Sequence, residues 1–114
     1  MQRNLLKQFG NDAEELGVRF LQEAGFVIVE RNYYARKLGE IDIIAHRDGV
    51  WHFVEVKSAS TDFDPIYNLS RTKIARVVRS TLYFLKERGL DVSFSIDALI
   101  VRRGEVELIE NITL

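Results

Sequence analysis

The amino-acid sequence predicts a single α/β domain over residues 1–114, with a central mixed five-stranded sheet flanked by helices. Three observations support this fold class. Two segments repeat apolar residues with the period of a helix, and five shorter segments are rich in the β-branched and aromatic residues that strands favour. No repeat, low-complexity tract or Pro/Gly/Ser-rich linker divides the chain, whose only proline is Pro65. The expected order of the elements is α-β-β-β-α-β-β.

The first helix is expected to run from about Leu5 to Ala24. Its apolar residues recur at spacings of three and four, which is the period of one helical face. These residues are Leu5, Phe9, Ala13, Leu16 and Phe20. Gly25 follows directly and favours termination of the helix at its carboxyl end.

Three strands are expected next, at residues 26–30, 40–45 and 51–57. The basic and aromatic stretch over residues 31–37 is expected to be irregular. Asp48-Gly49 lies between the second and third strands and favours a tight hairpin turn, because glycine accepts positive φ without penalty. These two strands are therefore expected to be antiparallel neighbours.

Residues 58–70 show neither a helical nor a strand period, which indicates a long loop suited to a lid or a substrate-binding segment, or else a disordered one. A second helix is expected from Thr72 to Arg88, with Ser70 or Asn68 as its cap and Gly89 just past its end. The side chains expected on one side of it are Ile74, Val78, Thr81, Leu82 and Leu85. Strands at residues 92–101 and 105–109 complete the sheet.

The composition excludes several kinds of site and classes of protein. The absence of cysteine excludes disulfides, thiolate zinc sites and cysteine nucleophiles. The chain has 16 basic and 17 acidic residues, a balance that argues against a nucleic-acid binder of the strongly basic kind. The N-terminal residues reach charges before any signal-like apolar stretch, and no apolar run is long enough to span a bilayer. We therefore expect a cytoplasmic protein that does not associate with membranes.

Three acidic and basic side chains interrupt otherwise apolar strands. Asp42 lies in the segment GEIDII, and Glu55 and Lys57 lie in the segment WHFVEVK. Because strand side chains alternate, Glu55 and Lys57 share one face of their strand, and Glu40 and Asp42 share a face of the neighbouring strand. A hairpin register that brings Asp42 beside Glu55 would unite two carboxylates and an ammonium group.

Two neighbouring carboxylates repel each other unless a proton, a basic side chain or a metal ion lies between them. Oxygen ligands select a hard cation, so we expect Mg²⁺ or Mn²⁺ as cofactor and phosphodiester hydrolysis as the chemistry. The residues alone leave a second interpretation open, in which Asp42, Glu55 and Lys57 form a salt-bridged cluster on a solvated sheet face.

Several motifs in a fixed order carry a family resemblance. They are Gly10-Asn-Asp-Ala-Glu14, Arg31-Asn32, Gly39-Glu-Ile-Asp42, Phe53-Val-Glu-Val-Lys57, Lys73 and Asp97. From Gly10 to about Ile112 the chain resembles the YraN-type bacterial proteins, members of the PD-(D/E)XK nuclease superfamily that are similar to archaeal Holliday-junction resolvases. Two places depart from the family pattern: Ala59 stands where an arginine is common, and Ser95-Ile96 where an arginine-aromatic pair is common.

The resemblance implies a restriction-endonuclease-like fold and a metal-dependent endonuclease that hydrolyses DNA phosphodiester bonds. It also implies branched DNA such as Holliday junctions as substrate, a role in DNA recombination and repair, and a homodimer. The small size and the lack of an obvious recognition element favour, as a further alternative, a nuclease subunit that is active only with a protein partner. By the same resemblance Asp42 and Glu55 bind the catalytic metal, Lys57 assists hydrolysis, and Glu14 completes the acidic cluster. Helical periodicity favours Glu14 over Glu15 as well, because Glu14 adjoins the apolar stripe.

DNA contacts are expected from Arg31, Asn32, Tyr34, Arg36, Lys37 and Lys73. The basic and aromatic side chains between residues 31 and 37, Tyr33 included, suit phosphate contact and base stacking, and an ordinary surface loop explains them nearly as well. Asn32 and Lys73 enter through the family motifs.

We assign no catalytic or metal-binding role to the other polar residues. His46 borders a turn, and His52 faces away from Glu55 by strand alternation. Asp97 suits structural hydrogen bonding, and Arg76 suits an ordinary solvated helix face. An alternative function is a non-catalytic or partner-dependent DNA-binding or interaction module on the same scaffold.

Overall fold

Five strands form one sheet in the spatial order β1-β2-β3-β4-β5. The computed structural model describes residues 2–59 and 69–113, and of residues 2–11 it describes the backbone alone. The elements are α1 (Gln2–Glu23), β1 (Val27–Tyr34), the 3₁₀ helix η1 (Arg36–Leu38), β2 (Glu40–Arg47), β3 (Val50–Ala59), α2 (Arg71–Glu87), β4 (Ser93–Arg102) and β5 (Glu105–Ile109). Among the described strands only β3 and β4 pair in parallel, and α2 lies between them in the chain. The predicted α/β class, mixed sheet and order of elements are therefore confirmed, with η1 added.

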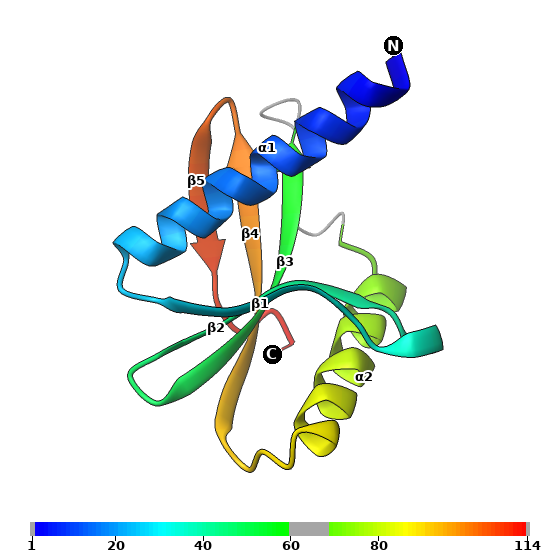
Figure 1. The fold of residues 1–114 in the computed structure, drawn as a ribbon, viewed down its shortest axis with the longest axis vertical. Coiled ribbons are helices and arrows are strands. Elements are labelled where there is room, and N and C mark those ends of the chain that lie inside the picture. The colour runs from blue at the N-terminus through cyan, green and yellow to red at the C-terminus, as the bar shows by residue number, and fades with distance from the viewer. Residues whose placement is uncertain (1, 60–68, 114) are drawn as a thin grey trace.

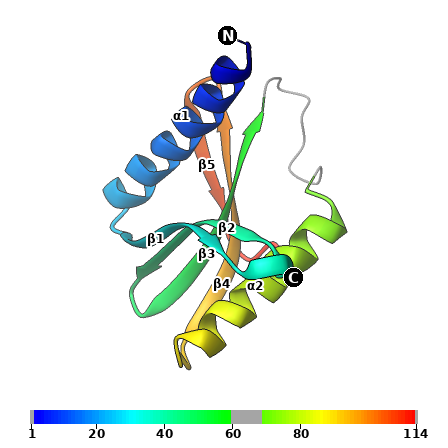
Figure 2. The same cartoon turned by 45° about the vertical axis from the view of Figure 1, so that its right-hand side comes forward.

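The two helices cover opposite faces of the sheet (Figures 1 and 2). Residues of α1 pack against the sheet in one buried cluster, the α1 core. Its members include Ala13, Val18 and Leu21 of the helix and Ile43, Ala45, Val54 and Leu99 of the strands. Residues of α2 form a second, the α2 core, with Ile44, Phe53, Val77, Phe84 and Ile96 among its members. The neighbours Phe53 and Val54 enter different cores because strand side chains alternate. Burial on both faces explains why the central strands read as nearly continuous apolar runs.

The buried face of α1 differs slightly from the predicted one. Gly17 and Leu21 are buried at its centre, while Leu16 and Phe20 lie partly buried at its border. A Cβ at Gly17 would lie 3.0 Å from Leu99 Cδ2, so this glycine permits close packing of α1 on β4. The predicted stop at Gly25 is confirmed by its φ of +90°. The side chains of Leu5 and Phe9 lie outside the described residues.

The prediction of an irregular stretch at residues 31–37 was wrong for its first half. β1 continues through Tyr34, with Arg31 opposite Ile43 and Tyr33 opposite Ile41. β1 is an edge strand, so it needs only one paired side and tolerates polar side chains that an interior strand would not. The predicted loop also begins later than expected, because β3 includes Ser58 and Ala59; residues 60–68, with the alternative cap Asn68, lie outside the described part.

α2 buries a face rotated from the one predicted. Its buried residues are Val77, Ser80, Thr81, Phe84 and Leu85. Leu82, expected in the core, is 52% exposed. Phe84 decides the orientation, because it packs edge-on against Tyr33 and Phe53 at the centre of the α2 core. Neither helix is long and apolar enough, in its described residues, to cross a membrane.

Two hairpin turns have the conformation that their sequences favour. Asp48 and Gly49 have φ values of +52° and +78°, and the antiparallel pairing of β2 with β3 is confirmed. Arg103 and Gly104, at +48° and +80°, join β4 to β5 in the same way. Both turns require positive φ at two successive residues, which identifies them as primed hairpin turns.

Candidate active site

The sheet divides at the candidate site. β2 and β3 pair only over residues 43–47 and 50–54. Beyond this point β2 remains paired with β1, whereas β3 remains paired with β4 to its end. The two strands therefore diverge, as Figures 1 and 2 show. Asp42 and Glu55 are the first residues on the two branches of this fork.

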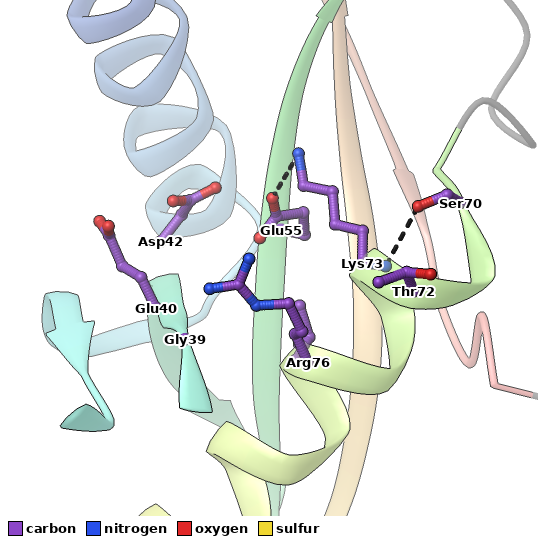
Figure 3. Close-up of a pocket in the computed structure, with 9 residues that line it drawn as sticks. Gly39, Glu40, Asp42, Glu55, Ser70, Thr72, Lys73 and Arg76 are labelled. Carbon is purple, nitrogen blue, oxygen red and sulfur yellow. Dashed lines mark hydrogen bonds and ion pairs between the residues drawn. The ribbon is translucent and has the colours of Figure 1, made fainter. Parts of the chain in front are cut away.

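Asp42 and Glu55 line one cavity of about 370 Å³ between the fork and α2. The backbone N–H of Val56 donates to Asp42 Oδ2 at 2.8 Å, which holds the Asp42 carboxylate toward β3. The other lining residues are Gly39, Glu40, Ser70, Thr72, Lys73, Arg76 and Val77. In Figure 3 the carboxylates come from the strands and the cationic side chains reach across from α2. The two residues predicted to bind metal are thus brought together.

The carboxylates raise the proton affinity of Asp42. Burial and then the negative charge of Glu55 raise the pKa of Asp42 to about 7. The hydrogen bond from Val56 lowers this pKa, and the charges of Glu14 and Glu40 raise it further. A divalent cation among these oxygens would replace the proton and relieve the repulsion, and carboxylate oxygens are the ligands that hard cations prefer. The donor set of Asp42 and Glu55 therefore fits Mg²⁺ or Mn²⁺.

α2 supplies the cationic wall of the cavity. Lys73 Nζ lies 3.0 Å from Glu55 Oε1, and the Lys73 side chain is 50% exposed (Figure 3). Arg76, one turn further along, lines the same cavity, and its Nε donates to the carbonyl oxygen of Leu38 at 3.4 Å. Ser70 caps the helix by accepting a hydrogen bond from Lys73 N at 3.1 Å, which confirms one of the two predicted caps. The positive end of the helix dipole therefore also faces the cavity.

Gly39 brings the start of β2 close to α2. Its φ is +145°, and a Cβ there would lie 3.0 Å from Ser80 Oγ. Only glycine satisfies both the backbone conformation and the close approach. The hydrogen bond from Ala35 N to the Gly39 carbonyl, at 2.8 Å, closes the η1 turn just before Glu40. This packing sets the distance between the carboxylates of β2 and the cations of α2.

Glu14 approaches the fork from α1, on the other face of the sheet. Its Oε1 accepts hydrogen bonds from Arg31 Nη2 at 3.2 Å and from Asn32 Nδ2 at 3.0 Å. Arg31 Nη1 also lies 2.7 Å from Glu15 Oε1, and this bond raises the pKa of the arginine. The side chain of Glu14 is 14% exposed, against 53% for Glu15. Two residues expected to bind DNA, Arg31 and Asn32, thus contact a glutamate of the same chain.

Lys57 lies two residues beyond Glu55 on β3, where parallel pairing places it beside Ile100. Alternation puts Lys57 on the same face of the strand as Glu55. The continuous register between β3 and β4 keeps this alternation intact along the branch, as the sequence predicted.

The stretch predicted to contact DNA divides into exposed and buried members. Tyr34 is 71% exposed, and Arg36 and Lys37 are exposed on η1, next to the cavity. Tyr33 is buried in the α2 core, and its hydroxyl donates to Glu87 Oε1 at 2.9 Å. Tyr33 is therefore a structural residue, while its neighbour Tyr34 presents an aromatic ring to solvent.

Besides the helix cap Ser70, three polar lining residues were not predicted as site residues from the sequence. Glu40 shares the cavity with Asp42, and Thr72 and Arg76 line it from α2. The alternation of Glu40 with Asp42, and the one-turn spacing of Arg76 from Lys73, were signals that could have found them. Their relation to Glu55 depended on how α2 crosses the sheet, which periodicity does not specify.

A second group of polar residues lies away from the cavity, around Asp97. His52 Nδ1 lies 2.6 Å from Asp97 Oδ2 and 3.7 Å from Glu110 Oε1. Ser95 Oγ and the backbone N–H of Asn111 donate to Asp97 Oδ1. The side chains of His52, Asp97 and Glu110 lie close enough together to ligate a metal, but the fully buried Asp97 already has hydrogen-bond partners for both oxygens. The group fastens the chain after β5 to β4, and the predicted structural roles of His52 and Asp97 agree with this geometry.

The chain matches one protein family over most of its length. A profile described as "Uncharacterised protein family UPF0102" matches residues 13–110. The chain belongs to the UPF0102 family. UPF0102 is the YraN-type family that the sequence motifs indicated, and the matched segment extends from the start of the described α1 side chains to the end of β5. All the residues that line the cavity lie inside it.

Similar UPF0102 proteins occur in several bacteria. One from Sulfurovum sp. (strain NBC37-1) is 56% identical over 112 residues, covering 98% of this chain and 99% of the relative. One from Wolinella succinogenes is 54% identical over 105 residues, covering 92% and 95%. One from Helicobacter pylori (strain HPAG1) is 47% identical over 104 residues, covering 91% and 90%. These UPF0102 relatives match the chain along nearly its entire length.

Proposed function

We propose that the protein is a metal-dependent endonuclease with a restriction-endonuclease-like fold of the PD-(D/E)XK type, which hydrolyses phosphodiester bonds in DNA. One observation supports this most strongly. Asp42 and Glu55, on diverging strands, line a single cavity whose opposite wall carries Lys73 and Arg76. A site with carboxylates on one side and cations on the other can hold a hard metal and a phosphate together.

Asp42 and Glu55 would hold the metal, Mg²⁺ or Mn²⁺. Such an ion, when bound, supplies Lewis-acid chemistry that polarises a phosphate and lowers the pKa of water. Glu40 and Glu14 add negative charge around Asp42, which strengthens the attraction for a cation. Three elements contribute carboxylates, so cation binding would also draw β2, β3 and α1 together at the fork.

The cationic wall would bind the scissile phosphate. Lys73 and Arg76 point into the cavity from one face of α2, and the amino terminus of that helix adds its dipole. Arginine and lysine beside the metal site can balance charge that develops on the phosphoryl oxygens. Lys57, on the Glu55 face of β3, is proposed to orient the attacking water and to assist its deprotonation.

The DNA backbone would continue from the cavity over η1. Arg36 and Lys37 are exposed there, and Tyr34 offers a ring for base stacking. The preference for branched DNA such as Holliday junctions, the link to recombination and repair, and the pairing of two chains rest on the family resemblance. Because cleavage on two strands needs two sites, a homodimer would suit a junction substrate.

Cleavage of labelled DNA tests the proposal. Wild-type protein, Asp42→Asn and Glu55→Gln should each be incubated with four-way junction, nicked, duplex and single-stranded DNA in Mg²⁺, Mn²⁺ or EDTA. Wild type should cut the junction in either metal, and neither variant nor the EDTA reaction should do so. Glu15→Gln is the matched control, since Glu15 lies outside the cavity and pairs with Arg31 on the surface.

The Lys73–Glu55 ion pair favours a second candidate function. With Lys73 3.0 Å away, Glu55 already has a cationic partner, so the site could serve as a non-catalytic or partner-dependent DNA-binding module. Tight junction binding in EDTA, with no cleavage in any metal or after addition of host extract, would support that function and contradict the nuclease.

A further inference from the structure

We propose that Arg31 and Asn32 are positioning residues that hold Glu14 against the Asp42 branch of the fork, and that they do not contact DNA. The inference rests on the proposed function, because it assigns to Glu14 a role beside the metal ligands. It reassigns two residues that the sequence alone placed in the DNA interface. The basis is a set of contacts from β1 to α1.

The hydrogen bonds to Glu14 converge on a single atom. Arg31 Nη2 and Asn32 Nδ2 both donate to Glu14 Oε1, at 3.2 and 3.0 Å. Two donors on one oxygen restrict rotation of the carboxylate and hold the second oxygen, Oε2, at its opposite edge. Glu14 is thus fixed by donors from a strand, which is a more rigid support than a loop.

The pairing of β1 with β2 sets Asn32 beside Asp42. Arg31 and Tyr33, which flank Asn32, pair with Ile43 and Ile41, which flank Asp42. The residue whose amide holds Glu14 therefore occupies the backbone position across the ladder from Asp42. The negative charge of Glu14 acts on Asp42 at this position and not on a remote part of the surface.

Asn32 adopts a backbone conformation that is uncommon inside a strand. Its φ is +53°, in the left-handed region that asparagine tolerates better than most residues. Such a conformation persists when surrounding contacts over-determine it. The contact available here is the one to Glu14, on the helix that covers this face of the sheet.

Both terminal nitrogens of Arg31 contact glutamates of the same chain. Nη1 contacts Glu15, Nη2 contacts Glu14, and Nε is buried without a hydrogen-bond partner among the described residues. A phosphate would have to approach a guanidinium that two glutamates already surround. Arg36 and Lys37, by contrast, are exposed on η1.

Calorimetric titration with Mn²⁺, with thermal unfolding as a check on folding, tests the proposal. The principal variant is Asn32→Gly, because glycine keeps the left-handed backbone and removes only the amide. We expect Asn32→Gly and Glu14→Gln each to weaken Mn²⁺ binding about tenfold or more, the range for residues that orient metal ligands. Combining them should weaken binding no further than Glu14→Gln alone, because both remove the same support.

Three further variants make the test specific. Arg31→Lys keeps the positive charge, although its single nitrogen replaces the two that contact the glutamates. Because the charge and the Asn32 bond to Glu14 remain, this variant should weaken Mn²⁺ binding less than Asn32→Gly. Glu30→Gln removes a carboxylate from the same strand that pairs with Arg88, and Glu15→Gln removes the outer partner of Arg31; both should bind Mn²⁺ as wild type does.

The outcomes separate this inference from the proposed function. Wild-type Mn²⁺ affinity in Asn32→Gly, together with loss of binding in Asp42→Asn, would overturn the positioning role alone. A drop in junction affinity for Asn32→Gly in EDTA, in the Glu14→Gln background, would overturn it too, since it would show direct DNA contact. Absence of Mn²⁺ binding in wild type would defeat the proposed function and this inference with it.

Discussion

Asp42 and Asp97 both interrupt apolar strands of the same sheet, but their surroundings differ. Those of Asp97 are typical of a structural residue, and those of Asp42 are typical of a binding or catalytic residue. Asp97 is fully buried, with His52, Ser95 and Asn111 donating to or sharing protons with its two oxygens. Asp42 accepts a hydrogen bond from Val56, and burial together with the neighbouring carboxylates raises its pKa. The first group is complete within the protein. In the second, repulsion between carboxylates remains, and a proton or a bound cation would relieve it.

The largest expected effect is the loss of DNA cleavage when Asp42 or Glu55 is replaced. Asp42→Asn and Glu55→Gln should each lower junction cleavage about a thousandfold or more, because each removes a proposed metal ligand worth several kcal/mol of transition-state stabilisation. Single-turnover cleavage with excess protein measures this. Asp97→Asn should retain cleavage within about tenfold wherever it folds, because Asp97 lies outside the cavity. Equal losses in all three variants would erase the distinction between the clusters.

For the free energy of unfolding, the Asp97 variant should show a larger loss than the Asp42 variant. Asp97→Ala should lower the free energy of unfolding by about 3 kcal/mol, since it leaves buried donors without their acceptor. Asp42→Ala should lower it by less than about 1 kcal/mol, because the lost bond from Val56 is offset by the relief of repulsion with Glu55. Urea unfolding of the two alanine variants makes the comparison directly. A larger loss for Asp42→Ala would contradict it.

Lys73 on α2 should contribute more to DNA affinity than to the stability of the fold. Lys73→Met should weaken DNA binding about tenfold, while its half-exposed pair with Glu55 contributes at most about 1 kcal/mol to stability. Fluorescence anisotropy in EDTA measures the DNA affinity. Lys86→Met, in the last turn of the same helix and outside the cavity, removes the same charge and should change affinity little. Matching losses in the two variants would indicate a general charge effect.

The pH dependence of stability gives the smallest effect. The pKa of Asp42 is about 7 in the folded protein, against an ordinary value of 3.8, so the folded state binds more protons than the unfolded state between these values. The Asp42 contribution therefore makes the protein less stable as pH rises from about 4 to about 7. Asp42→Asn removes this term and should be nearly neutral at pH 4. At pH 8 it should stabilise by about 1 kcal/mol, discounted for solvent screening.

Chemical denaturation of wild type and Asp42→Asn across this range tests the sign. Stabilisation by the variant that grows with pH agrees with a raised pKa. A variant that loses stability relative to wild type as pH rises would mean that Asp42 is held ionised in the folded protein, and that Glu55 does not repel it.

Much of the fold could be predicted because local chemistry specifies it. Asp48-Gly49 permits the positive φ values of a tight turn, and Gly25 and Gly89 end the two helices. The same turn makes β2 and β3 neighbours, which is why the sequence alone could predict that Asp42 and Glu55 lie together. Alternation then placed Lys57 with Glu55 and turned His52 away.

Other features depend on long-range packing that no local pattern contains. The fork exists because the pairing of β2 with β3 ends before Asp42 while each strand stays paired with its other neighbour, which is a property of the whole sheet register. Arg76 reaches the cavity because Phe84 fixes the rotation of α2, and that rotation also leaves Leu82 exposed. Asn32 turns toward α1 through a left-handed backbone that its sequence permits but does not require.

Anomalous diffraction from crystals soaked in Mn²⁺ tests the central claim most directly, because it compares both clusters in one experiment. The expected result is a peak within coordination distance of Asp42 and Glu55, with Lys73 moved away from Glu55 and no peak at His52, Asp97 and Glu110. A peak at the His52 cluster alone, or none beside Asp42 and Glu55, would contradict the assignment of the fork as a metal-dependent active site.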